Sequence, residues 1–206
     1  MKHWTLSLLI LVVSLCFARV GVAQSRYIYK PASDKVMEMG VSIGASAMHM
    51  SLDAADGVAL SPKIGVRAAL EMAMVWHNDY ALQIELAYLY NRIDASRAGK
   101  EYDVKSNVME IPIMFSYRGL GPMRFNLGPV LSLASAGRYT NGVERIEFGR
   151  MRPTLGYTAG IGVELTQHLA VDARFTGGLA RTDNYFEGVE FRSSACWATL
   201  GVIYLF

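Results

Sequence analysis

The feature that most constrains this chain is an alternation of apolar and polar side chains, with a period of two residues, that recurs in eight segments between residues 37 and 206. From Tyr80 to Tyr90, every even position is apolar or aromatic, whereas the odd positions include Gln83 and Glu85. This period is that of a β-strand with one apolar face. Each segment approaches or exceeds the roughly 9–11 residues that a tilted membrane-crossing strand needs. The pattern therefore predicts eight strands long enough to cross a bilayer.

The connections between these segments alternate in length. Three are predicted to be turns of three residues, at 77–79, 119–121 and 166–168. The links between them are longer and polar, near 51–61, 93–104, 139–151 and 182–190. A strict alternation of short and long links is typical of an all-β, eight-stranded antiparallel up-and-down transmembrane β-barrel with tight periplasmic turns and wider extracellular loops. A sandwich or jelly roll would not produce this rhythm.

The N-terminal residues are those of a secretion signal. Lys2 and His3 precede an apolar run over residues 6–18, and Gly21-Val22-Ala23 offers small residues for cleavage after Ala23. The run is too short to span a membrane as a helix, which needs roughly 20 residues. We expect a signal peptide at 1–23, a periplasmic lead-in at 24–35 and an outer-membrane barrel of a Gram-negative bacterium at 36–206.

The C-terminal segment is an apolar stripe that ends on an aromatic residue. Every second side chain from Cys196 to Phe206 is apolar or small, and these side chains share one face of a strand. Chains of the bacterial outer membrane commonly end in this way, since the last strand must pair with the first to close a ring in lipid. We expect this strand, with Phe206, to be the segment that the barrel-assembly machinery engages, and the barrel to be monomeric.

Charge and cysteine content exclude several classes of partner and cofactor. Cleavage after Ala23 would leave 18 basic and 18 acidic residues, and no basic stripe suits a nucleic acid. Cys196 would be the one remaining thiol, which allows neither an internal disulfide nor a cysteine-rich metal site. The histidines are dispersed, and the glycines occur at sheet spacing with no strand-to-helix transition. We therefore expect no catalytic group, no metal and no cofactor.

Charged residues on the inward faces are predicted to fill the barrel. Eight strands leave an interior only wide enough for side chains, and charges removed from water must be paired. The core of the expected network comprises Arg67, Glu71, Glu85, Glu110, Asp172 and Arg174. Further inward candidates are Glu38, Lys63, Arg118, Arg124 and Glu164.

Strand register makes this network specific. If Trp76 pairs with Tyr80, Glu71 lies opposite Glu85, and these like charges need Arg67 and Arg174 as partners. If Leu165 pairs with Leu169, Gly162 faces Asp172 and Gly160 faces Arg174, so that glycine leaves room for long side chains. Pro112 and Pro129 each remove a ladder donor, so we expect a bulge or local distortion at one of them.

Aromatic and apolar side chains in the long links are the candidates for an interaction surface. They are Tyr139, Ile146, Phe148, Tyr185 and Phe186. These side chains could contact lipopolysaccharide or a secretion or envelope protein, or could fold back over the barrel mouth. Tyr27, Ile28 and Tyr29 in the lead-in are candidates for docking a periplasmic component.

Several short segments resemble one family in their order and spacing. They are Met109-Glu110-Ile111-Pro112, Phe125-Asn126-Leu127-Gly128-Pro129, Ala159-Gly160-Ile161-Gly162-Val163-Glu164-Leu165 and Asp172-Ala173-Arg174-Phe175. Together they resemble the PorT-like outer-membrane β-barrel domain, often labelled porin family. The resemblance extends over about residues 36–206 and implies a small monomeric barrel without an assigned activity.

The sequence favours a structural or binding role and leaves three alternatives. One is a narrow channel for ions or small solutes. Another is a hydrolase acting through His49, which lies near Ser51 and Asp53 at the expected outer rim. The third, a soluble ligand-binding barrel, would leave long apolar stripes in water.

Overall fold

The computed structural model describes residues 35–53, 58–77, 79–97, 100–134, 138–140, 145–147, 154–179, 182–186 and 189–206. The expected signal peptide and nearly all of the lead-in lie outside these residues. None of the described residues forms a helix long and apolar enough to cross a membrane. The described strands are β1 (Lys35–Asp53), β2 (Val58–Trp76), β3 (Tyr80–Arg97), β4 (Lys100–Leu120), β5 (Met123–Ala134), β6 (Arg138–Thr140), β7 (Arg145–Glu147), β8 (Thr154–Glu164), β9 (Leu169–Gly178), β10 (Thr182–Phe186) and β11 (Val189–Leu205).

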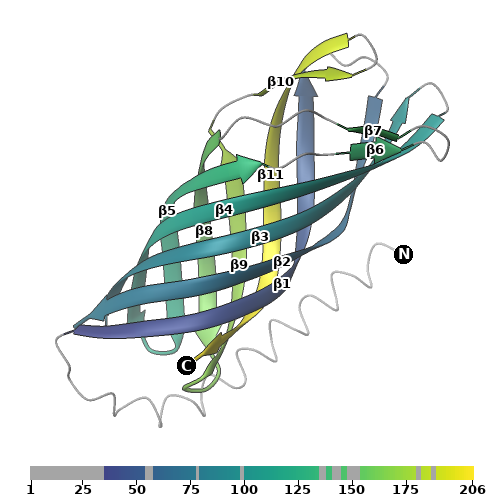
Figure 1. Cartoon of the computed structure of the whole chain (residues 1–206). Helices are drawn as coiled ribbons and strands as arrows, with labels where there is room; N and C mark the ends of the chain where they lie inside the picture. Colours follow the sequence, from purple (N-terminus) through teal and green to yellow (C-terminus); the bar gives the residue numbers. More distant parts are fainter. Residues whose placement is uncertain are drawn as a thin grey trace.

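Eight of these strands form a closed antiparallel ring in the order β1-β2-β3-β4-β5-β8-β9-β11 (Figure 1). β11 pairs with β1 from Gly40↔Leu205 to Asp53↔Arg192, which leaves the ring without an edge. The short strands β6, β7 and β10 attach at one end of the ring, through β4 and β11. The predicted fold class, an eight-stranded up-and-down barrel, is confirmed.

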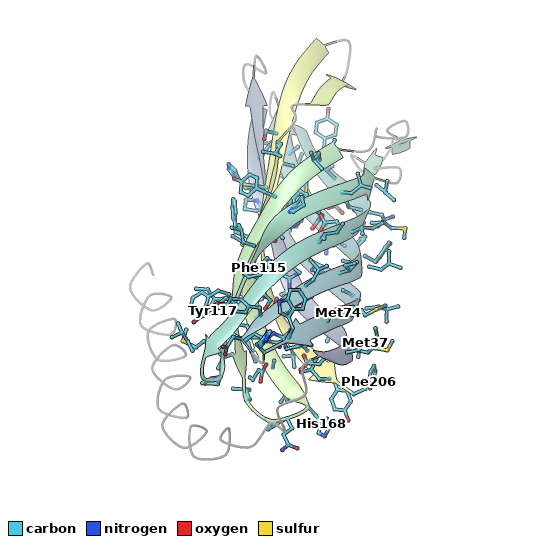
Figure 2. The ribbon with its side chains drawn as sticks, turned by 90° about the vertical axis from the view of Figure 1, so that its left-hand side faces the viewer. Met37, Met74, Phe115, Tyr117, His168 and Phe206 are labelled. Carbon is cyan, nitrogen blue, oxygen red and sulfur yellow. The ribbon has the colours of Figure 1, made fainter. Side chains whose placement is uncertain are left out.

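The two faces of the wall differ as predicted. Along β3, Leu86 is 46% exposed on the outer surface, whereas its neighbour Glu85 is 1% exposed in the lumen. Figure 2 shows Met37 and Met74 directed away from the barrel wall. The outward side chains of all eight strands are mainly Leu, Ile, Val, Met, Phe and Tyr, and we refer to this surface as the lipid-facing belt.

Backbone pairing closes the barrel at the end that carries the short turns. His168 contacts the last strand twice: the Leu205 amide donates to the His168 carbonyl at 2.8 Å, and the His168 ring Nδ1 lies 3.0 Å from the Leu205 carbonyl. The His168 ring stacks on Tyr204, with ring centroids 6.0 Å apart, and Tyr204 meets Phe206 edge-on at 5.7 Å. His168 and Phe206 lie at the same end of the molecule in Figure 2.

The turns at this end differ in detail from the prediction. The connection at 77–79 is as expected, with His77 at a φ of 53°. The turn expected at 119–121 is wrong: β4 continues to Leu120, which pairs with Met123, and Gly121-Pro122 make the turn. Gly121 has a φ of 64°, a conformation that glycine adopts at little cost, so the chain reverses one residue later. The third turn spans Leu165 to His168.

The long polar links expected near 51–61 and 93–104 are largely strand, so this prediction is wrong. β1 continues to Asp53 and β2 begins at Val58, while β3 ends at Arg97 and β4 begins at Lys100. Loss of the apolar stripe marks the edge of the lipid-facing belt, but backbone pairing continues past it. We call residues 49–53, 58–63, 91–97 and 100–107 of β1–β4 the extracellular extension, after the side on which the alternation of link lengths predicts this end to lie.

A bulge in β2 reverses the predicted orientation of Lys63. Register shifts between Lys63 and Val66, so that Lys63 pairs with Arg92 and Val66 pairs with Tyr90. Residues paired across neighbouring strands point to the same face, so Lys63 lies on the outer surface with Arg92 and forms an ion pair with Asp94 at 2.6 Å. The prediction that Lys63 faces the lumen is therefore wrong.

The two prolines interrupt pairing without shifting it. Between β3 and β4, the paired positions stop at Ile84↔Ile113 and resume at Ala87↔Glu110 in the same register, on either side of Pro112. Between β4 and β5, they stop at Pro112↔Val130 and resume at Phe115↔Leu127, opposite Pro129. The expected distortion thus occurs at both prolines, whereas the register shifts lie elsewhere.

Candidate functional site

A cluster of ion pairs occupies the middle of the lumen. Inward positions of β2, β3 and β9 bring Arg67, Glu85 and Arg174 together. Glu85 Oε2 accepts hydrogen bonds from Arg67 Nη2 and from Arg174 Nη1, the latter at 2.6 Å. Arg174 Nη2 also donates to Asp172 Oδ2 at 2.6 Å. All four side chains are at most 7% exposed, so these charges interact at low local dielectric.

Glu71 lies directly opposite Glu85, in the register that the sequence predicts. Gln83 Nε2 donates to Glu71 Oε2 at 3.2 Å and to Glu85 Oε1 at 2.7 Å, and thereby lies between the two carboxylates. Glu71 Oε1 is buried without a hydrogen-bond partner among the described residues. The charge of Glu85 is therefore compensated by two arginines, whereas Glu71 has a buried carboxylate oxygen without a hydrogen-bond partner among the described residues.

The other inward charges are paired separately. Glu110 accepts a hydrogen bond from the Ser132 hydroxyl group at 3.3 Å, and not from an arginine of the central cluster. Nearer the short turns, Arg118 donates to Glu38 at 2.5 Å, and Arg124 lies 3.7 Å from Glu164. A small recess between these pairs and the central cluster is lined by Glu38, Glu71, Gln83, Arg118 and Arg124, among others.

Glycines make room for the long side chains. Gly160 pairs with Arg174 and Gly162 with Asp172, as the register predicts. A Cβ on Gly160 would lie 3.3 Å from Arg174 Cγ, and one on Gly162 would lie 3.5 Å from Arg124 Nε. A side chain at position 160 would therefore press on the arginine that contacts both Asp172 and Glu85.

An apolar layer, which the sequence analysis missed, fills the lumen toward the extracellular extension. It consists of Met48, Ala69, Ala87, Leu89, Ile93, Val108 and Trp197, with Leu60, Val104 and Ala195 packed against it. Leu89 is fully buried and Trp197 is 7% exposed. The sequence did carry a signal for this layer. Leu89, Val108 and Trp197 occupy inward positions of their strands, where a lumen filled by charges alone would have polar side chains.

Four of the five loop candidates lie at the end of the barrel that carries the extracellular extension. Tyr139 of β6 pairs with Ile146 of β7, and Phe186 of β10 pairs with Val189 of β11. Tyr185 also lies on β10, so four of the five candidates are on short strands rather than in loops. Phe148 lies outside the described residues.

The structure brings no catalytic or metal-binding cluster together among the residues it describes. His49 is exposed on the outer face of β1, opposite Cys196 of β11. Ser51 and Asp53 follow on the same strand. The described His, Cys, Asp and Glu residues form no group of three suited to a metal ion.

A closed ring with an apolar exterior and a charged interior defines a class, the small β-barrels of the bacterial outer membrane. Residues 22–184 match the family described as outer membrane protein beta-barrel domain. The chain therefore belongs to this family. It is an outer-membrane protein of the Gram-negative type.

Solved structures support the same fold. The Neisserial surface protein A (NspA) superposes with a TM-score of 0.57 at 14% identity, over 82% of this chain and 97% of NspA. Ail, the attachment invasion locus protein of Yersinia pestis, superposes with a TM-score of 0.50 at 14% identity, over 82% of this chain and 98% of Ail. No curated protein sequence matches the chain significantly.

The unequal pairing of the two glutamates predicts unequal effects of substitution. Glu85→Gln leaves Arg67 and Arg174 without their shared carboxylate and should lower the free energy of unfolding by about 3–5 kcal/mol. Glu71→Gln removes a like charge opposite Glu85 and should change it by less than about 1 kcal/mol. Urea unfolding of the refolded barrel in lipid vesicles measures both values. Equal losses in the two variants would contradict the assignment of Glu85 as the compensated carboxylate.

Proposed function

We propose that the protein is a non-conducting outer-membrane barrel that acts by binding other envelope or extracellular molecules at its extracellular extension. The observation that carries this proposal is the filling of the lumen by two successive layers, one of ion pairs and one of apolar side chains. With the interior occupied, the surface outside the lipid-facing belt is the part of the molecule available for interaction.

The charged layer supports a closed lumen because its groups hold one another. Glu85 is shared by two arginines, and one of these also binds Asp172. An ion entering this layer would have to displace a buried ion pair, and breaking such a pair costs several kcal/mol. The arrangement favours a structural role for these charges over an ion relay.

The apolar layer opposes conduction in a different way. Leu89 and Val108 have no side-chain group that water or an ion could bind in exchange for lost hydration. Hydrophobic constrictions exclude water from narrow pores. A solute that passed the ion pairs would therefore meet a dry barrier.

The extracellular extension supports a binding role because paired strands hold its side chains in fixed positions. β3 and β4 pair from Tyr80↔Tyr117 to Arg97↔Lys100, with Glu101 exposed near the end of this hairpin. A rigid, polar, projecting hairpin suits recognition better than a mobile loop. Tyr139, Ile146, Phe148, Tyr185 and Phe186 remain candidates for apolar contacts with a partner.

The remaining assignments belong to this proposal. The protein would be a monomer without enzymatic activity, related to the PorT-like barrels, and inserted by the barrel-assembly machinery through the strand that ends in Phe206. A signal peptide would be removed after Ala23. Its partners would be outer-membrane lipid, lipopolysaccharide and an envelope or secretion protein.

A closed lumen predicts electrical silence. The refolded chain in a planar lipid bilayer should show no discrete conductance steps, because both layers block a water path. Trp197→Ala, which thins the apolar layer and leaves the arginine cluster unchanged, should remain silent. Discrete conductance of the unaltered protein would contradict the proposal and favour the narrow channel.

A binding role predicts cross-links at one end of the barrel. A photoreactive residue at Glu101, near the end of the β3–β4 hairpin, should form a discrete cross-linked product in intact cells. The same residue at Gln167, which is exposed in a short turn at the opposite end, is the control for surface exposure. Absence of any product at Glu101, with normal insertion of the variant, would leave the binding role without support.

A further inference from the structure

A row of basic residues crosses the outer surface of the extracellular extension. Lys63 of β2 pairs with Arg92 of β3, and Arg92 pairs with Lys105 of β4. In β6, Arg138 is the strand partner of Lys105. The bulge in β2 is what places Lys63 in this row rather than in the lumen.

The height of the row is set by the belt beneath it. On β3, outward apolar and aromatic side chains run from Tyr80 to Tyr88, and Tyr90 follows. The distance from Tyr80 to Tyr90 corresponds to about 24 Å along the membrane normal for a strand tilted by about 45°. This matches the apolar thickness of an outer-membrane barrel. Arg92 is the next outward residue, at the level where lipid headgroups begin.

The cations of the row are held unequally by neighbouring acids. Two acids lie within ion-pair distance of it: Lys63 binds Asp94 at 2.6 Å, while Lys105 and Arg92 share Asp103 at 3.1 and 3.7 Å. Cations directly opposite one another on paired strands repel. Three described cations thus share the two acids within ion-pair distance, and Arg92, at 3.7 Å, is the most weakly held.

The row is open to the surroundings of the barrel. The side chains of Lys63, Arg92 and Lys105 are 40, 39 and 36% exposed. Guanidinium and ammonium groups together suit a phosphate, which accepts several charge-assisted hydrogen bonds.

We propose that the row Lys63–Arg92–Lys105 binds the phosphate of an anionic lipid headgroup in the outer leaflet. This inference specifies one partner of the extracellular extension and so rests on the proposed function. The adjacent acids tune the site, since Asp94 and Asp103 compete with the phosphate for the same cations. The belt holds the acyl chains of the bound lipid directly below its headgroup.

Titration of the refolded chain in a neutral detergent tests this site. The probe is bis-phosphorylated lipid A, with its dephosphorylated form as the comparison, and native mass spectrometry gives the bound fraction. An interfacial basic residue contributes about a fivefold gain in affinity for an anionic lipid. Arg92→Gln together with Lys105→Gln should therefore weaken binding about 25-fold.

The matched control changes the charge of the same site in the opposite direction. Asp94→Asn with Asp103→Asn should tighten binding of bis-phosphorylated lipid A, because both competitors for the cations are removed. If the double basic variant fails to refold, Lys63→Gln alone should still weaken binding about fivefold. Retention of heat-modifiable migration in gels verifies that each variant is folded.

Three results would overturn the proposal. They are unchanged affinity in the basic variants, equal binding of dephosphorylated lipid A, and binding of inorganic phosphate alone as tight as that of bis-phosphorylated lipid A, which would make free phosphate the ligand. None of these results depends on conductance or on cross-linking at Glu101, so failure of this site and failure of the proposed function are distinguishable.

Discussion

The whole structure depends on the pairing of β1 with β11. Hydrocarbon offers no hydrogen bonds, and each unpaired backbone group costs several kcal/mol there, so a sheet can cross a bilayer only as a ring without an edge. The ladder from Gly40↔Leu205 to Asp53↔Arg192 provides that closure. Once the ring is closed, side chains have two destinations, lipid or lumen, and the two-residue period of a strand assigns each residue to one of them.

Closure also explains the contents of the lumen. The belt must be apolar, so variation in chemistry is confined to the inner face and to the parts of the strands beyond the membrane. Inside, the central buried charges are held by one another, as when Glu85 accepts from both Arg67 and Arg174. Glycine at position 160 leaves space for the second of these arginines. Toward the extension, Trp197 and Leu89 complete the filling by packing rather than by pairing.

Much of this architecture was predictable from the sequence because a period of two is simple to read over ten residues. It gave the order of the strands, the inward position of Glu71 opposite Glu85, and the outward position of Leu86. Strand ends were less accessible: β3 and β4 continue as paired strands after their side chains become polar, and polarity alone suggested a loop.

Local irregularities were the other limit on prediction. The bulge that turns Lys63 outward adds one residue to β2. A strict two-residue period assigns every residue to a face by counting, so it cannot predict an inserted residue. Pro62, directly before Lys63, and Gly65, two residues after it, were the available signals, since both residue types are common where a ladder is disturbed. The apolar layer escaped detection because small and apolar residues such as Ala87 and Leu89 fit either face of a strand. The lumen therefore contains an apolar layer as well as the charged residues that the sequence predicted.

Lipid-phase labelling of single cysteines tests the division between lipid and lumen most directly. In a Cys196→Ser background, Leu86→Cys and Ala87→Cys place a thiol at neighbouring positions of β3, one 46% and the other 1% exposed. A thiol reagent dissolved in the bilayer should label position 86 and leave position 87 unmodified until the barrel is unfolded. Equal labelling of both positions in the folded protein, or preferential labelling of position 87, would contradict the closed barrel described above.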